Sequence, residues 1–431
     1  MSRRRLIVAG AVAATLAASG LVALLLVRSG AEHPPAAPPG QWHPLRGARP
    51  LTAKQRREMA RLESLSYLAG YKHAPPQSGV TVHDRNAAYP GLNLIFSGHG
   101  PEARLVDMDG RTVHTWRCTY ARAEQANPAL RGGVGGGRWS WRRGHVLESG
   151  DLLAIFDGLG LIRIDRRSRL LWAHARGFHH DLFVERDGTI HALTRRARII
   201  PRINPDEPVL VDYVTTLSPS GKTLGEIALL EAFEGTPFAR LLGRLARKGD
   251  LFHTNAIQVL DGENAAASPA FRRGNILLSV LYMDAVVILD PTRRKIVWAA
   301  TRDWKRQHEP VLLPGGTMLL YDNLGAAGQS RILELDPLTL KTVWEYRGTT
   351  AQPFFSAECG TVHRLPNGNT LIVESLNGRA FEVTPEKRIV WELYNPHRAG
   401  KDGELIATLF DVIRLPAGFG RGWLAGPQTD K

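Results

Sequence analysis

One pattern recurs six times along this chain: a β-rich segment, a polar turn and a second β-rich segment, which ends in Trp in five copies. A repeat of this kind indicates structural units that cannot bury their apolar faces alone and must pack against one another. Each copy is predicted to be a hairpin, because Asp, Pro, Ser or Gly occupies its turn. The copies are Ala103–Trp116, Gly160–Trp172, Tyr213–Ile227, Ala285–Trp298, Arg331–Trp344 and Arg379–Trp391.

Two further apolar segments precede most of these hairpins, so each unit has four predicted strands. The segments directly before the hairpins are Leu92–Ser97, Gly150–Phe156, Gly188–Leu193, Gly274–Leu281, Gly316–Tyr321 and Gly368–Glu374. The earlier ones are Gly144–Leu147, Asp181–Val184, Ala256–Leu260, Pro310–Leu313 and Gly360–Leu365. Four strands in each of six units predict an all-β fold, a six-bladed β-propeller. The crossover helices that parallel α/β folds require are missing, and only Phe233–Arg247 is expected to form an inserted helix.

The sixth of the earlier segments, Phe410–Leu415, comes at the far end of the chain, while the strands within Gly79–Trp116 lack one of their own. We therefore expect the last strand to join the first blade and close the ring, which removes exposed sheet edges. The Trp residues that end the hairpins are expected to pack between blades.

The N-terminus carries a membrane signal. Three arginines precede the uncharged run Leu6–Val27, which is long enough to cover the roughly 30 Å hydrocarbon core as a helix. The basic end should stay cytoplasmic, so residues 29–431 are predicted to lie in the periplasm or another extracytoplasmic space. Ala17–Gly20 is compatible with a cleaved signal peptide, but the apolar run continues beyond it, which favours an uncleaved, single-pass anchor.

A stiff tether and a helix are predicted between this signal and the first repeat. Six prolines within residues 30–50 favour an extended chain. Thr52–Tyr71 is predicted to be helical, with Met59, Leu62 and Leu65 on one face. The predicted organisation is 1–28 anchor or signal, 29–50 tether, 51–78 helical segment, 79–420 propeller and 421–431 C-terminal tail.

Composition limits the function further. Lys and Arg number 55 against 41 Asp and Glu, a net charge of +14, but the basic residues are dispersed, so no nucleic-acid partner is expected. The 2 cysteines, Cys118 and Cys359, exclude a disulfide scaffold and a four-cysteine zinc site. A bond between them is permitted outside the cytoplasm, and two separate buried thiols are equally compatible with the sequence.

Three histidines fall at equivalent phases of the repeat. His180, His253 and His308 each stand eight or nine residues before the Gly that precedes the following strand, and Arg142 occupies this position in another unit. Equivalent points of a ring converge on its axis, so the three imidazoles are expected to face one another across the channel. They could bind a metal, or act as nucleophile and acid/base partners. Arg142 or Arg143 near the same rim would favour an anion.

These motifs resemble those of the bacterial arylsulfate sulfotransferases, over about residues 60–396. The resemblance includes the Leu65–Tyr71 element and the Gly79–Trp116 entry. Its more specific part is a set of short motifs: His179-His180-Asp181, Phe252-His253-Thr254-Asn255, Gln307-His308-Glu309 and Tyr321-Asp322-Asn323. It implies a periplasmic six-bladed propeller that moves a sulfuryl group from one phenol to another without a nucleotide sulfate donor and without a cofactor or metal.

The resemblance also implies roles for the histidines. His308 would be the nucleophile and form a sulfo-histidine, while His180 and His253 would bind the sulfuryl oxygens or assist proton transfer. The family's catalytic Arg, on the strand after the second histidine motif, is missing, and Tyr282 or a neighbour stands in its place. Arg142, Arg143 or Arg273 is the candidate replacement. The predicted substrate-binding residues are Arg142, Arg143, Tyr282, Asn255 and Asn323.

Two other functions stay open at this point. One is a non-catalytic extracytoplasmic propeller for ligand or protein binding, in which the three histidines hold an anion or a metal. The other is a quinone- or metal-dependent oxidoreductase, which paired cysteines or a dense acidic calcium site would have favoured. The sulfotransferase hypothesis predicts a small phenolic or aryl sulfate substrate, with the lipid bilayer contacted through residues 6–27.

Overall fold

The computed structural model describes residues 51–63, 72–131, 136–326 and 329–424. The chain divides into two units, Met1–Leu51 and Thr52–Lys431, and the architecture described below belongs to the second. The predicted anchor and tether lie outside the described residues, as does the 64–71 part of the predicted helix. No helix within the described ranges is long and apolar enough to cross a membrane.

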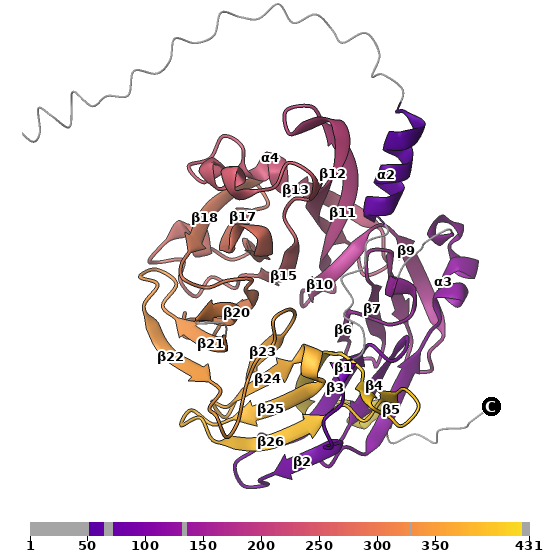
Figure 1. Cartoon of the computed structure of the whole chain (residues 1–431), viewed down its shortest axis with the longest axis vertical. Coiled ribbons are helices and arrows are strands. Elements are labelled where there is room, and N and C mark those ends of the chain that lie inside the picture. The colour runs from indigo at the N-terminus through magenta and orange to yellow at the C-terminus, as the bar shows by residue number, and fades with distance from the viewer. Residues whose placement is uncertain (1–50, 64–71, 132–135, 327–328, 425–431) are drawn as a thin grey trace, which may run out of the picture. The chain divides into compact units, whose positions relative to one another are not determined.

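Six sheets of four or five strands follow one another along the described chain (Figure 1). The first contains β29 (Leu409–Pro416), β3 (Gly91–Ser97), β4 (Glu102–Val106) and β5 (Thr112–Arg117). The second contains β6 (Arg143–Val146), β7 (Leu152–Phe156), β8 (Gly160–Ile164) and β9 (Leu170–Ala175). The third contains β10 (Phe178–Val184), β11 (Ile190–Ile200), β12 (Asn204–Leu217), β13 (Thr223–Ala228) and, parallel to β12, β14 (Gly249–Asp250).

The remaining sheets repeat this order. The fourth contains β15 (Thr254–Val259), β16 (Ile276–Val280), β17 (Ala285–Asp290) and β18 (Lys295–Thr301). The fifth contains β19 (His308–Leu312), β20 (Met318–Ala326), β21 (Gln329–Leu335) and β22 (Thr342–Arg347). The sixth contains β23 (Thr361–Arg364), β24 (Thr370–Glu374), β25 (Arg379–Val383), β26 (Ile389–Tyr394) and β2 (Gly79–His83). A small sheet joins β1 (Lys72–His73), β28 (Leu405–Ile406) and β27 (Arg398–Ala399).

The first strands of neighbouring sheets contact one another in the order β6, β10, β15, β19, β23 and β29. An ion pair between Arg143 of β6 and Asp411 of β29 links the two ends of this series. The last strand, β29, pairs antiparallel with β3, so the predicted closure of the C-terminal strand onto the first blade is confirmed. The described fold is therefore mostly β and propeller-like.

All six predicted hairpins are confirmed as antiparallel strand pairs. Their turns depend on a side chain at the end of the first strand. In four of them an Asp oxygen accepts backbone N–H groups from residues two to four positions ahead, the Asx geometry that such turns favour. These residues are Asp107, Asp165, Asp290 and Asp336.

The Trp residues at the hairpin ends connect adjacent sheets, as predicted. In four sheets the indole N–H donates to a backbone carbonyl in the next sheet of the series. The bonds are Trp116 to Gly150, Trp172 to Pro219, Trp344 to Pro385 and Trp391 to Met108. The last of these joins the sixth sheet to the first. The indoles therefore hold the sheets together at their outer edges.

The helices are short and peripheral. They are α2 (Ala53–Glu63), α3 (Tyr120–Ala126), α4 (Leu229–Phe233) and α5 (Arg421–Leu424), with 3-10 turns at Pro128–Leu130, Gly136–Arg138, Ala239–Arg244, Pro269–Phe271, Leu281–Met283 and Ser375–Asn377. Within the predicted Thr52–Tyr71 helix, α2 accounts for the described part, and its Met59 and Leu62 pack against Ala197 and Leu210. The predicted tail, 421–431, is described only as far as 424, in α5.

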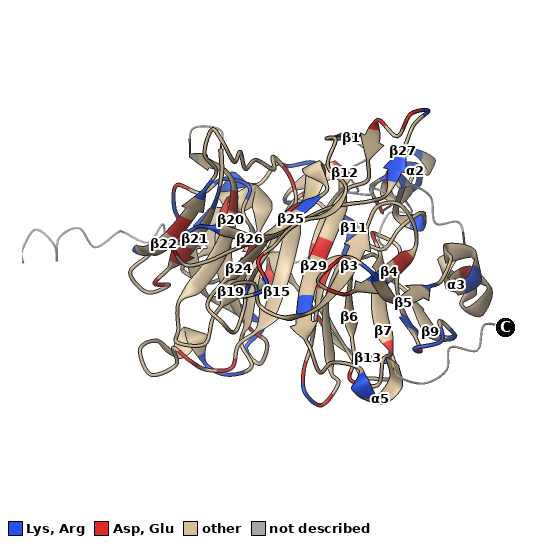
Figure 2. Cartoon of the chain, turned by 90° about the horizontal axis from the view of Figure 1, so that it is seen from below, with Lys and Arg blue, Asp and Glu red and all other residues tan. Residues whose placement is uncertain are grey.

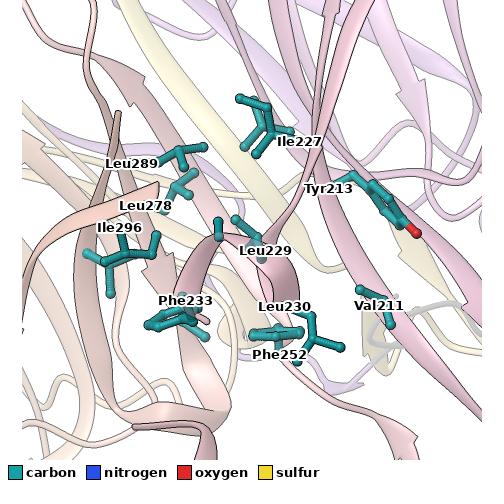
Figure 3. Close-up of a cluster of buried hydrophobic side chains, with 14 of the residues drawn as sticks. Val211, Tyr213, Ile227, Leu229, Leu230, Phe233, Phe252, Leu278, Leu289 and Ile296 are labelled. Atoms are coloured by element: carbon teal, nitrogen blue, oxygen red, sulfur yellow. The ribbon is translucent and has the colours of Figure 1, made fainter. Parts of the chain in front are cut away.

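The predicted Phe233–Arg247 helix is wrong. Gly235, at φ 71°, and Pro237 separate α4 from the 3-10 turn, because a left-handed backbone and a missing N–H interrupt helical hydrogen bonding. The segment instead packs between the third and fourth sheets, where Phe233 lies against Phe252 (Figure 3). This core fixes the residue directly before His253.

Charged residues of both signs are interspersed over the elements, as Figure 2 shows. The two cysteines are free and buried at separate places, so the alternative of two separate thiols describes them. Cys118 follows β5, and Cys359 precedes β23.

Candidate functional site

The structure brings the three predicted histidines together at the starts of three first strands. His180 lies in β10, His253 directly precedes β15, and His308 opens β19. The ring centroids of His180 and His253 are 4.8 Å apart. The Arg142 guanidinium, just before β6, is close enough to act electrostatically on both His180 and His308.

Each of these strand starts departs from regular β geometry. The register shifts between Phe178 and Leu182, between Thr254 and Ala256, and between His308 and Val311. His180 and His253 adopt φ values of 52° and 50°. A left-handed backbone costs an L-residue about 1–2 kcal/mol, and such strain and β-bulges are concentrated at functional sites, where they re-aim side chains.

The hydrogen bonds of His308 fix which ring nitrogen carries the proton. Its Nδ1 lies 2.9 Å from Asn323 Oδ1 and 3.0 Å from the Arg306 carbonyl oxygen. The Asn323 orientation is set because its Nδ2 donates to the carbonyls of Ser356 and Cys359, at 2.8 and 2.7 Å. Both neighbours of Nδ1 are therefore acceptors, so Nδ1 is protonated and Nε2 holds the lone pair.

Burial lowers the pKa of His308 to about 3, and the charges of Arg142 and His253 act in the same direction. The hydrogen bond to Asn323 opposes this shift without cancelling it. His308 is therefore neutral at physiological pH, with its Nε2 lone pair available for attack or for metal binding.

The backbone before His308 is held by the fourth sheet. Gln307 Nε2 donates to Ser279 Oγ and to the backbone carbonyls of Val280 and Ala285. The Gln307 backbone carbonyl accepts from Asn255 Nδ2 at 3.0 Å. Asn255 and Asn323 are both predicted substrate-binding residues. In the structure the Asn255 side-chain amide contacts the Gln307 backbone carbonyl, and the Asn323 side-chain amide contacts the His308 ring.

His253 is oriented by a carboxylate. Its Nδ1 lies 3.0 Å from Asp250 Oδ2, while Asp250 Oδ1 accepts the His253 backbone N–H. Behind this pair, burial and the nearby Asp250 charge raise the pKa of Asp212 to about 8. The Tyr282 ring, 42% exposed, has its centroid 5.0 Å from that of His253. Asp250 lies three residues before His253, a spacing that could have indicated the pair from the sequence.

The third histidine has a histidine neighbour. The Nδ1 atoms of His179 and His180 are 2.8 Å apart, so one ring donates and the other accepts. Burial lowers the pKa of both well below the ordinary value, and for His180 the charges of His253 and Arg142 add to the effect. Both imidazoles are therefore neutral.

The three candidate arginines have different environments. Arg142 is buried, donates to Cys359 Sγ at 3.3 Å, and has no carboxylate oxygen within 4.0 Å among the described residues. Arg143 instead donates to the carboxylates of three other first strands, at Asp181, Glu309 and Asp411. Its guanidinium thus uses three of its five N–H donors on carboxylates, and the predicted substrate contact stays a prediction.

Arg273, the third candidate, lies at the other end of its hairpin from His253. Thr254 pairs with Val280 beside the site, whereas Val259 pairs with Ile276 at the opposite end. The intervening five residues span roughly 16 Å at strand geometry. Of the three candidates, Arg142 is therefore the one that the structure places near the histidines.

One group in the described part of the chain has the residue types and spacing to hold a metal: His99, Glu102 and His397. It lies on the first sheet and its neighbouring loop and does not include the three clustered histidines. Glu102 already accepts from Arg104 and Arg117, whose positive charges oppose a cation.

The comparison with protein families decides the family. The model of the arylsulfotransferase (ASST) family matches residues 146–397, more than half of the chain and all three histidine motifs. The chain belongs to this family. Membership supports an arylsulfotransferase-like function on aryl or phenolic substrates. No curated protein matches the chain.

Solved structures resemble the fold at low sequence identity. A protein of unknown function from Bacteroides caccae is 15% identical, with 70% of this chain and 93% of that one covered and a TM-score of 0.48. A streptogramin B lyase is 13% identical, with coverage of 80% and 95% and a TM-score of 0.43. The WD40 β-propeller domain of Doa1 is 12% identical, with coverage of 80% and 96% and a TM-score of 0.41. At these values the likeness has no bearing on function.

Proposed function

We propose that this arylsulfotransferase family member is a six-bladed propeller that transfers a sulfuryl group between phenols through a covalent sulfo-histidine on His308. The observation that supports this most strongly is that His308 is neutral and carries its one ring proton on Nδ1. With Nδ1 committed to two acceptors and the pKa lowered to about 3, Nε2 is a neutral nitrogen nucleophile at physiological pH.

In the first half-reaction His308 Nε2 attacks the sulfur of an aryl sulfate. The N–S bond forms, the S–O bond to the ring breaks, and the phenolate leaves. His253, held by Asp250, gives the leaving oxygen a proton. Arg142 and His180 donate to the sulfuryl oxygens as charge develops there, a role that the family's missing Arg would otherwise fill.

The second half-reaction is the reverse with a new phenol. His253 takes the proton of the incoming hydroxyl, the phenolate oxygen attacks sulfur, and the N–S bond breaks. The protons balance over one turnover, and no nucleotide, metal or oxidant enters. Tyr282, half-exposed beside His253, offers an aromatic face to either phenol ring.

The test uses the purified full-length chain, a chromogenic aryl sulfate and a phenol acceptor. We expect phenolate release that depends on the acceptor, and, with donor alone, an SO₃ adduct on the peptide containing His308. His308→Ala should abolish both signals. The matched control is His145→Ala. This histidine lies in β6, the first strand of the second sheet, and has no role in the proposed reaction. No release from folded wild type with several acceptors, with or without added metals, would reject the proposal in favour of a non-catalytic binding propeller.

We also propose that residues 6–27 anchor the protein in the cytoplasmic membrane, with the propeller outside the cytoplasm. The support is the uncharged run behind three arginines. Membrane fractions should contain the full-length chain at its uncleaved mass. A chain shortened by the signal mass in the soluble fraction would show a cleaved signal peptide instead.

A further inference from the structure

A cavity of about 440 Å³ is lined by residues of the second and third sheets, of α2 and of the segment around α3. Its walls include Arg131, Arg176, Arg195, Arg196, Tyr120 and Leu130. Cavities of 300–1,000 Å³ are typical of small-molecule sites. None of these residues belongs to the site described above.

Two residues of the cavity wall place the cavity near the histidines. Gly177, in its wall, is three residues before His180, and its carbonyl accepts the Arg195 backbone N–H at 3.0 Å. Arg195 is also close enough to lower the pKa of His179 and His180, in addition to the larger effect of burial. Two residues of the cavity wall, Gly177 and Arg195, are therefore near the histidine cluster.

The cavity is rich in positive charge. Arg176 and Arg196 share one carboxylate, Glu226, at 3.1 and 2.7 Å. The Arg196 Nε is buried and has no acceptor in the described part of the structure. A buried donor without a partner is uncommon and destabilising, and an anion in the cavity would supply the missing acceptor.

One carboxylate, Glu63, also lies in the wall, where its Oε1 accepts the Ala197 backbone N–H, and the remaining wall is mostly apolar. Ala129, Leu130, Leu159 and Ala175 line it together with the Tyr120 ring. The Tyr120 hydroxyl donates to the Leu130 carbonyl, so the ring is fixed in the wall. Guanidinium groups beside a fixed aromatic and aliphatic surface match a ligand that is itself aromatic and anionic.

We propose that this cavity binds the anionic end of aryl substrates, that is, arenes with a sulfonate, carboxylate or second sulfate, beside the catalytic histidines. The inference rests on the proposed function for its substrate class, but binding itself does not require transfer. Such a cavity would make phenols with an additional anionic group better acceptors than neutral phenols of the same ring size.

The binding test uses 2-naphthalenesulfonate as the probe, because the reaction does not break its C–S bond. The protein is the full-length Arg142→Gln variant, in which the catalytic site lacks the Arg142 guanidinium. Calorimetry should show that this variant binds the probe, and that the affinity falls tenfold or more when Arg131→Gln and Arg196→Gln are also introduced. Arg167→Gln, an exposed arginine in a turn of the second sheet, is the matched control and should leave the affinity unchanged. Equal affinity with and without the two cavity substitutions would overturn the proposal.

The ligand class has its own control. Inorganic sulfate should bind at least tenfold more weakly than the naphthalenesulfonate, because it lacks the aryl part. Equal affinity would overturn the aromatic assignment. Thermal melting of each variant checks that the loss of binding is not a loss of fold.

The kinetic test separates this inference from the proposed function. In a protein that keeps Arg142, the double substitution Arg131→Gln/Arg196→Gln should raise the KM of a carboxylated phenol acceptor tenfold or more. The kcat and the KM of a neutral phenol should stay unchanged. If transfer is absent but sulfonate binding depends on the two arginines, the cavity assignment stands and the catalytic proposal fails. If transfer occurs and neither KM nor sulfonate binding responds, the cavity assignment fails alone.

Discussion

The proton on His308 Nδ1 decides the chemistry of the site at the scale of single residues. A protonated Nε2 would make the same ring a donor and not a nucleophile. The side chain that sets this state, Asn323, is itself set by two backbone carbonyls of the segment before β23. The protonation state of the proposed nucleophile is thus set by the fifth sheet and by the segment leading into the sixth.

The first prediction concerns pH. Because burial lowers the pKa of His308 from 6.5 to about 3, protonation of His308 should not slow its attack between about pH 8 and 5. The measurement is single-turnover formation of the sulfo-histidine from a nitrophenyl sulfate, whose leaving group needs no proton. A tenfold loss of rate per pH unit below about 6.5 would contradict the assignment.

The second prediction concerns Arg142. Arg142→Gln should lower kcat about 10²–10³-fold, the usual effect of losing one oxyanion donor. Cys359→Ser keeps the guanidinium and replaces only the thiol it contacts, so its effect should be small. Similar kcat values for wild type and Arg142→Gln would show that another group replaces the family's missing Arg.

At this scale the sequence indicated the histidines and Arg142, because equivalent phases of a repeat converge in space. It did not indicate that Arg143 contacts three carboxylates or that Asn323 acts on His308. Those contacts join residues 15 to 268 positions apart, and local spacing contains no information about them. The Asp250–His253 pair was local and was overlooked.

At the scale of elements, the hairpins were predictable and the inserted segment was not. Asp turns and terminal Trp residues recur with the repeat, so each copy supported the others. The predicted helix at 233–247 does not form because Gly235 and Pro237 interrupt its hydrogen bonds. Tertiary packing against Phe252 and the third sheet determined the result.

The third prediction belongs to the segment before β23. A Cβ added at Gly360, where φ is 138°, would lie 2.5–2.6 Å from ring carbons of the buried Tyr321. Gly360→Ala should therefore destabilise the fold by about 1–3 kcal/mol or more and disturb the neighbouring Cys359 carbonyl that holds Asn323. Gly225→Ala in β13, where a Cβ meets nothing within 4 Å, is the matched control in urea unfolding. Equal stabilities would show that the Tyr321 ring moves aside at little cost.

At the scale of the molecule, the ring is joined at its outside by indoles and at its centre by one arginine. Arg143 of β6 bonds Asp181 of β10, Glu309 of β19 and Asp411 of β29, while Asp181 also accepts the Ile257 N–H of β15. Thr361 and His363 of β23 both bond Asp411. All six first strands therefore meet in one buried polar network. Strand closure was predictable from strand counting, but this network was not.

The fourth prediction follows from that network. Arg143→Gln leaves three buried carboxylates without their cation, and breaking such a group typically costs about 3–5 kcal/mol. Burial already raises the pKa of Glu309 to about 7 against the opposing charge of Arg143. Without Arg143 it should rise further. A folded-state pKa above the unfolded value gives stability that is present at low pH and lost as pH rises through the folded pKa. The loss caused by Arg143→Gln should therefore be larger at pH 8 than at pH 5 in urea unfolding. A loss that is equal at both pH values would mean that the carboxylates find other partners, and that ring closure does not depend on this arginine.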